Sequence, residues 1–324
     1  SSLAAIVMAL CGCGVWTLAW QPVILAGVKS GLLWTTNRWR PQCYFSMEII
    51  RDLFGFASSL LLSGLLNVVF INVYSLVIPR LYPKRELGLF TQGNKICDPI
   101  VSLVYGSIQN ATYPIFSNIQ NQHDRLINAY RKSIRFTSFL TFPLLIGGVM
   151  VAPALFRLLF KSEWWDAIPF FQLLCMGGCF TVLTAINNNF IKVSGRSSGI
   201  LRIEIIKIAL TAVSIALLAR ESVLAMVAGL MAVRGVVHLI NIYYTQRYTG
   251  YGMWAQLCDT VPYLLLAMVM AAAVWSVGLV VDKPWLLLPL QIVAGAAVYT
   301  LLAYATGSKI LKDAIRLLLK KETL

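Results

Sequence analysis

Charged and polar side chains recur at helical spacing inside long apolar stretches of this sequence. Residues three or four apart share one face of an α-helix. One stretch carries seven such residues: Thr91, Lys95, Asp98, Ser102, Tyr105, Gln109 and Thr112. Three further stretches carry shorter sets: Thr181, Thr184, Asn188 and Lys192; Glu204, Lys207, Thr211 and Ser214; and Arg234, His238, Asn241 and Thr245. The spacing predicts four helices with polar faces, and together these faces predict a hydrated cavity.

The charges in these stretches favour an anionic ligand. Ammonium and guanidinium groups donate charge-assisted hydrogen bonds to phosphate oxygens. Arg234 shares its face with no acid, and its planar fork can hold two oxygens, so we expect it to be the leading anchor for a phosphate or pyrophosphate. The complete set of cavity candidates is Arg234, Lys95, Lys207, Lys29, Asp98, Glu204, Asn188, Gln109 and His238.

Simpler structural interpretations exist for most of these residues. Lys95 and Asp98 are three residues apart, as are Glu204 and Lys207, so each pair is spaced to neutralise itself. Arg234 could instead snorkel or brace the helix bundle. His238 fits a hydrogen-bonded core position better than a proton carrier. Asp259 opens an apolar stretch, where it is expected to cap a helix.

Motifs of several enzyme classes are missing from the sequence. It has no GxxxxGK[ST] phosphate loop, no HExxH and no Ser–His–acid set on a loop. The seven cysteines and two histidines are scattered without the second cluster that a tetrahedral metal site needs. We therefore expect no catalytic residues, no metal and no cofactor, and we predict that the protein is not an enzyme.

Composition shows which elements must position the polar residues. Of 324 residues, 58% are hydrophobic and 12% are charged, about half the charged share of a soluble domain. Together with a mean hydropathy of +0.74, this predicts a multi-pass membrane protein and excludes a nucleic-acid-binding module. A partial span is expected at 1–11, and nine full spans at 14–36, 54–78, 88–116, 130–160, 168–192, 199–219, 221–247, 258–281 and 284–306.

Loop charges predict the orientation of these spans. If the 37–53 loop is cytoplasmic, alternation places sixteen basic residues inside and six outside, in keeping with the positive-inside rule. Between Phe45 and Phe56 apolar and charged residues alternate, which predicts an amphipathic helix at the membrane interface. The segment 37–53 is thus a cytoplasmic linker, and 307–324 is a basic cytoplasmic tail.

The order of several motifs resembles that of a transporter family. The stretches are GVWTLAWQ at 14–21, RWRP at 38–41, GLFTQGNK at 88–95, QNATYPIFSNIQ at 109–120, AYRKSIR at 129–135, WDAIP at 165–169 and the segment 187–196. They are similar to bacterial polysaccharide and lipid-linked oligosaccharide flippases (Wzx-type) of the MOP superfamily, which also holds the MATE exporters. The resemblance covers essentially the whole chain and is stronger in order and spacing than in any single residue.

This resemblance implies a MATE-like bundle of fourteen helices, with two six-helix lobes around a central cavity and two further helices. The chain would then be N-terminally truncated, with 1–36 ending the first lobe, 54–247 forming the second and 258–306 the two extra helices. The implied function is to flip an undecaprenyl-pyrophosphate-linked oligosaccharide (an O-antigen, capsule or exopolysaccharide repeat unit) across the bacterial cytoplasmic membrane. Implied partners are this glycan lipid, membrane lipids, a polysaccharide polymerase and other assembly proteins, and no nucleic acid.

Two alternative functions stay open at this level. A MATE-like drug or cation antiporter would favour an acidic cavity, whereas the faces here are net basic. A membrane-embedded glycan polymerase or transferase would want acids or histidines on a sizeable loop. One departure from the family pattern concerns ion coupling: Tyr74 stands where many relatives have an acid, and Pro79 where they have a glycine, while Arg80 remains.

Overall fold

A computed structural model describes residue 8 and the ranges 16–37, 45–195, 197–281, 283–308 and 310–311. Throughout these ranges the chain is helical and no strand occurs. The chain divides into two compact units, Ser1–Asp52 and Leu53–Leu324. Helix α2 (Trp16–Thr36) belongs to the first unit, and α3 (Met47–Leu81) begins there and continues into the second.

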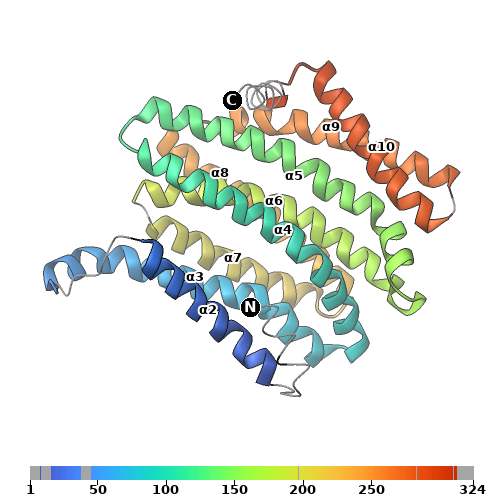
Figure 1. Ribbon diagram of the computed structural model, residues 1–324, viewed down its shortest axis with the longest axis horizontal. Coiled ribbons are helices and arrows are strands. Elements are labelled where there is room, and N and C mark those ends of the chain that lie inside the picture. Colours follow the sequence, from blue (N-terminus) through green and yellow to red (C-terminus); the bar gives the residue numbers. More distant parts are fainter. Residues whose placement is uncertain are drawn as a thin grey trace. The chain divides into compact units, whose positions relative to one another are not determined.

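The second unit is a bundle of long helices (Figure 1). After α3 come α4 (Lys84–Asn118), α5 (His123–Leu159), the short 3-10 helix η1 (Ser162–Ala167), α6 (Ile168–Val193), α7 (Ser197–Leu218), α8 (Val223–Thr249), α9 (Met253–Val280) and α10 (Pro284–Ala305). Helix α6 packs against α4, α5 and α8, and α9 and α10 pack against each other and against α5. Helix α7 packs mainly on α8.

The predicted all-α architecture is confirmed in the described ranges, where every predicted full span corresponds to one helix. Several helices begin earlier than their apolar runs, because the helix continues into a polar flank. The segment 45–56 does not form a separate interfacial helix: α3 runs unbroken from Met47 to Leu81. Residues 1–7, 38–44 and 312–324, which hold most of the predicted partial span, part of the linker and most of the tail, lie outside the described residues.

Local sequence signals explain where several helices begin and end. Pro83 precedes α4 in an extended conformation, which stops α3 at the preceding turn. Ser222 caps α8 by accepting a hydrogen bond from the Ala225 amide to its Oγ at 3.0 Å. Gly250 ends α8 with a φ of +66°, a left-handed conformation that glycine adopts without steric cost.

Glycines also set how closely the helices approach. A Cβ on Gly178 of α6 would lie 2.6 Å from Val101 of α4, and one on Gly229 of α8 would lie 2.2 Å from the Ser214 Oγ of α7. Such contacts between small residues and a neighbouring helix are the usual way in which membrane helices pack. They hold together the helices that carry the polar faces.

Within the described ranges, six helical segments are long and apolar enough to cross a membrane by length and composition alone: the Leu53–Leu81 part of α3, Ser162–Val193 (η1 with α6), α5, α8, α9 and α10. Helices α4 and α7 have the length but carry the most polar faces, such as Arg202, Glu204 and Lys207 on α7. Charged residues are tolerated in membrane helices when they face other helices or a water-filled cavity instead of lipid.

Candidate functional site

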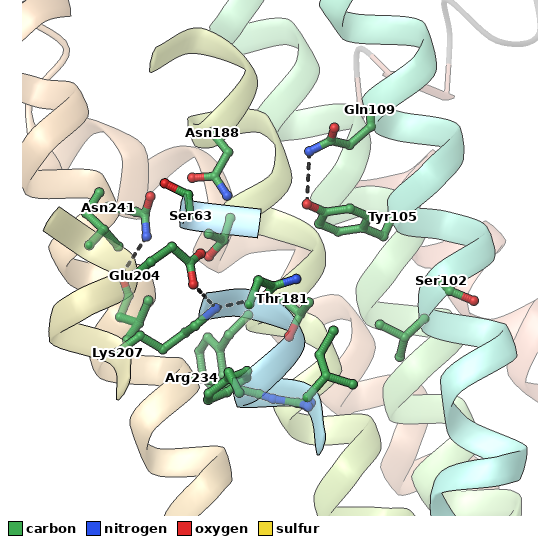
Figure 2. A pocket seen from close by; sticks show the side chains of 18 of the residues that line it. Ser63, Ser102, Tyr105, Gln109, Thr181, Asn188, Glu204, Lys207, Arg234 and Asn241 are labelled. Carbon is green, nitrogen blue, oxygen red and sulfur yellow. Dashed lines mark hydrogen bonds and ion pairs between the residues drawn. The ribbon is translucent and has the colours of Figure 1, made fainter. Parts of the chain in front are cut away.

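Five helices of the second unit, α3, α4, α6, α7 and α8, enclose a cavity of about 790 Å³ (Figure 2). We call it the five-helix cavity. Its charged and amide side chains are Asn67 from α3; Asn94, Asp98, Gln109 and Asn110 from α4; Asn188, Asn189 and Lys192 from α6; Glu204 and Lys207 from α7; and Arg234 and Asn241 from α8. The four predicted polar faces therefore converge on one cavity. Its role in binding a substrate stays a prediction.

Arg234 enters the cavity from α8 without a carboxylate partner. Among the described residues no ion pair reaches it, and its buried Nε has no hydrogen-bond partner. Its side chain lies against α6 at Gly177, where an added Cβ would be 3.2 Å from the Arg234 Cδ and 3.4 Å from one terminal nitrogen, Nη1. A guanidinium whose buried Nε lacks a partner is costly, and an anionic ligand would compensate it.

Lys207 enters the same cavity from α7, but its ammonium group is already engaged. The Nζ atom lies 2.5 Å from Glu204 Oε2 and donates a hydrogen bond to Asn67 Oδ1 at 2.9 Å. It also lies 4.3 Å from the centre of the Phe70 ring, which adds a cation–π contact. Figure 2 shows Lys207 beside Glu204, with a dashed line for their ion pair. Lys207 thus ties α7 to α3, and its charge is largely balanced.

The remaining sequence-predicted candidates differ in position. Asp98, Asn188 and Gln109 line the cavity, and Gln109 Nε2 donates to the Tyr105 hydroxyl at 3.0 Å. Lys95 is exposed on α4 and is not among the lining residues. In the described chain no ion pair joins Lys95 to Asp98, so the structure does not contain the pairing that their spacing suggested.

Two further candidates are not cavity-lining residues in this structure. His238 is buried beside the cavity, where its Nδ1 lies 3.1 Å from Thr184 Oγ1, as expected for a hydrogen-bonded core histidine. Lys29 belongs to α2 in the unit Ser1–Asp52. In the described residues no three His, Cys, Asp or Glu side chains gather into a possible metal site.

Several residues that form contacts at the cavity were not among the sequence-predicted candidates. Asn67 holds Lys207, and its only sequence signal was a weak stripe with Ser59 and Ser63 that is equally typical of interhelical packing. Phe70 had no signal, because one aromatic residue in an apolar helix is unremarkable. Asn189 is buried and donates to Thr112 Oγ1 at 2.8 Å and to the Gln109 carbonyl at 3.1 Å, which ties α6 to α4.

The role predicted for Asp259 is wrong. Helix α9 begins at Met253 after Gly252, so Asp259 lies in the second turn and does not cap the helix. Its carboxylate instead forms ion pairs with Arg131 at 3.1 Å and Arg135 at 2.6 Å, both on α5. The predicted span began at residue 258, where the apolar run starts, but α9 already begins at Met253.

Three relatives of this chain have names that place them in the biosynthesis of teichuronic acid, succinoglycan or lipopolysaccharide. The teichuronic acid biosynthesis protein TuaB of Bacillus subtilis is 26% identical over 54% of this chain and 37% of its own length. The succinoglycan biosynthesis transport protein ExoT of Rhizobium meliloti is 25% identical over 53% of this chain and 35% of its own length. The lipopolysaccharide biosynthesis protein WzxC of Escherichia coli is 24% identical over 43% of this chain. The chain thus spans about a third of the length of TuaB and ExoT.

Among solved structures, the chain resembles the lipid II flippase MurJ in its inward closed conformation. The TM-score is 0.62 over 85% of this chain and 57% of MurJ, at 15% sequence identity, which supports the shared fold. With the apolar helices described above, these findings make the chain a multi-pass membrane protein of the bacterial inner membrane with a flippase-like fold. Residues 1–169 match the family described as Polysaccharide biosynthesis protein, and because this match covers more than half of the sequence, the chain belongs to that family.

Proposed function

We propose that this chain is part of a flippase that moves an undecaprenyl-pyrophosphate-linked oligosaccharide across the cytoplasmic membrane. The observation that carries the proposal is Arg234, a guanidinium that lines a membrane cavity without a carboxylate partner. A pyrophosphate would supply the missing negative charge and could bridge both arms of the guanidinium fork. The names of ExoT, a transport protein, and MurJ, a flippase, support transport over chemical conversion.

Uncharged polar side chains around Arg234 suit the sugar part of such a cargo. Amide and hydroxyl groups of Ser102, Gln109, Thr181 and Asn188 line the same cavity and can exchange hydrogen bonds with sugar hydroxyls. Two lining cations, Arg234 and Lys192, form no ion pair with a described residue. This mixture of cations with many neutral donors and acceptors favours a phosphorylated glycan over a simple inorganic anion.

The MATE-like drug or cation antiporter is the second candidate, since it would share the fold. It would need an acidic site for its cation, and the two acids that line the cavity are Glu204, which is paired with Lys207, and Asp98. The more basic balance at Arg234 favours the flippase. A membrane-embedded polymerase or transferase has no specific observation in its favour.

The proposal extends to the organisation of the whole transporter. Residues 54–247 would form one six-helix lobe, 258–306 two additional helices, and 1–36 the end of the other lobe. The lobe beginning at residue 54 would supply the five-helix cavity as its half of the transport path. A polysaccharide polymerase and other assembly proteins are then expected to act on the flipped product.

Deletion of the complete gene tests this function. We expect undecaprenyl-linked oligosaccharide to accumulate on the inner leaflet and surface polysaccharide to fall, both restored by the wild-type gene. Lipid-linked oligosaccharide would be extracted and quantified, and its leaflet assigned by accessibility to an impermeant glycan-modifying enzyme. Normal export with increased drug sensitivity would instead support the antiporter.

A further inference from the structure

A second pocket, of about 460 Å³, lies among α5, α9 and the residues Thr306, Ser308 and Ile310 after α10. We call it the outer pocket. Its charged lining residues are Arg131, Lys132 and Arg135 from α5 and Asp259 from α9, so three basic side chains face one acid. This pocket shares no lining residue with the five-helix cavity and is not used by the proposed transport step.

Among the described lining residues of the outer pocket the one acid is Asp259, and two arginines share it. Arg131 Nε lies 3.1 Å from Asp259 Oδ2 and Arg135 Nη2 lies 2.6 Å from Oδ1, and the Tyr251 hydroxyl also donates to this carboxylate. Only 10% of the Asp259 side chain is exposed, against 40% for Arg131 and 33% for Arg135. Each guanidinium has five N–H donors, so both arginines keep donors that point away from the carboxylate.

Tyr251 helps to hold this arrangement in place. It lies between α8 and α9, and the Arg131 guanidinium lies over its ring, 5.0 Å from the ring centre. Burial raises the pKa of the Tyr251 hydroxyl, and its hydrogen bond to Asp259 raises it further. The hydroxyl therefore stays protonated and keeps donating to Asp259, so it occupies an acceptor position on the carboxylate. One carboxylate charge remains beside the two guanidinium charges.

The surroundings of the outer pocket are those of a membrane–water interface. Trp254 at the start of α9 and Tyr304 at the end of α10 are 78% and 67% exposed, as in the aromatic belts of membrane proteins. Leu265, Met268 and Val269 are exposed further along α9, about 9–15 Å beyond Asp259 at the rise of an α-helix. Exposed apolar residues thus follow the basic pocket along the same helix, α9.

We propose that the outer pocket binds the phosphate head group of an anionic phospholipid, with Arg131 and Arg135 as the donors. The acyl chains would lie along the exposed apolar face of α9. Basic pockets between transmembrane helices are a recurrent way of recognising anionic head groups. This lipid belongs to the surrounding bilayer and is distinct from the transported cargo, so the inference is independent of the proposed function.

Lipid binding to the purified full-length protein tests this inference. Native mass spectrometry would compare phosphatidylglycerol with phosphatidylcholine of the same acyl chains, with inorganic phosphate and undecaprenyl phosphate as separate competitors. We expect phosphatidylglycerol to bind roughly tenfold more tightly than phosphatidylcholine, a difference of about 1.4 kcal/mol. Inorganic phosphate at the same concentration should displace little of it, because it lacks the acyl chains.

Variants that change lipid affinity in opposite directions distinguish a lipid-binding site from a purely structural contact between α5 and α9. Asp259→Asn keeps the shape and removes the competing charge, so it should strengthen phosphatidylglycerol binding even if it weakens the contact between α5 and α9. The triple variant Arg131→Gln/Arg135→Gln/Asp259→Asn removes both proposed donors together with the carboxylate that they share and keeps Lys132. It should abolish the preference for phosphatidylglycerol. Arg247→Gln changes an exposed arginine at the end of α8, outside the pocket, and should leave the preference unchanged.

Three results would overturn the inference. Equal affinity for the two phospholipids would remove it, as would a preference that survives the triple variant. Displacement by undecaprenyl phosphate at a much lower concentration than phosphatidylglycerol would reassign the pocket to the transported lipid.

Discussion

The five-helix cavity and the outer pocket are both basic, but they differ in whether their arginines form ion pairs. In the outer pocket two half-exposed arginines share Asp259, and water can reach the group. In the five-helix cavity Arg234 has no carboxylate, although Glu204 lies in the same cavity and pairs with Lys207. An uncompensated cation costs much more where it is desolvated than where it is solvated. We therefore expect Arg234, and not the arginines of the outer pocket, to bind the cargo.

Lys207 and Arg234 show the same contrast within a single cavity. Lys207 bridges α7 to α3 through Glu204, Asn67 and Phe70, so its charge is used inside the protein. Arg234 lies against Gly177 with its Nε unpaired. We thus expect Lys207 to stabilise the packing of α7 against α3, and Arg234 to contribute to ligand binding in the cavity.

The largest expected effect comes from Arg234. In the intact transporter, Arg234→Ala should lower export by roughly tenfold to a hundredfold, because charge-assisted hydrogen bonds are worth about 1.5–3 kcal/mol. Arg234→Lys should be impaired less severely, since it keeps the charge without the fork. Surface polysaccharide would be measured beside the amount of protein in the membrane.

Arg220→Ala is the matched control, because Arg220 is an exposed arginine in the turn before α8. It should export at close to the wild-type level. Normal export by a well-expressed Arg234→Ala variant would remove Arg234 from the mechanism and leave the outer pocket as the better candidate for a phosphate site.

Breaking the pair of Glu204 and Lys207 should have the next largest effect, on stability. Glu204→Gln would leave the Lys207 ammonium with only Asn67 and Phe70, and loss of one partner of a buried pair costs about 3–5 kcal/mol. The double variant Glu204→Gln/Lys207→Gln should be milder than Glu204→Gln, because it leaves no buried charge. Thermal unfolding of the purified protein would provide the values for a double-mutant cycle.

Lys95 and Asp98 provide the comparison for that cycle. The structure contains no ion pair between them, so the effects of Lys95→Gln and Asp98→Asn should add. Strong coupling between Lys95 and Asp98, or additive effects at Glu204 and Lys207, would contradict the conclusion that the second pair interacts and the first does not.

A moderate effect is expected from Gly177→Ala. The new methyl group would lie 3.2 Å from the Arg234 Cδ, so the arginine side chain must move away from α6. A strain of about 1 kcal/mol, at the low end for overpacking, would lower export roughly fivefold. Gly106→Ala on α4 is the control, because nothing lies within 4 Å of an added Cβ, and it should have no effect on export.

Thiol labelling tests the sides of the membrane and should not affect function. Cys258 lines the outer pocket and is exposed, and the positive-inside bias predicts that the pocket opens to the cytoplasm. In a variant that keeps only Cys258, an impermeant maleimide should label inverted vesicles and spare intact spheroplasts. A variant that keeps only Cys43, in the predicted 37–53 linker, should behave alike, and labelling of either in spheroplasts would contradict the orientation.

Much of the fold was predictable because its signals are local. Apolar runs of the length of a bilayer predicted where the helices lie, and steps of three and four predicted the polar faces that α4, α6, α7 and α8 turn towards one cavity. Both patterns repeat within one helix and need no knowledge of its neighbours. The predicted preference for an anionic ligand followed from the composition of those faces.

The partners of the charged side chains could not be predicted from the sequence, because they depend on which helices become neighbours. Nothing in the spacing indicated that Lys207 reaches Asn67, 140 residues away, or that Asp259 binds two arginines of α5. Lys95 and Asp98 have the spacing of a pair but do not form one, whereas Glu204 and Lys207 do. Helical spacing determines which residues share a face, while the packing of the bundle decides which charges are neutralised, like Lys207, and which, like Arg234, form no ion pair in the described chain.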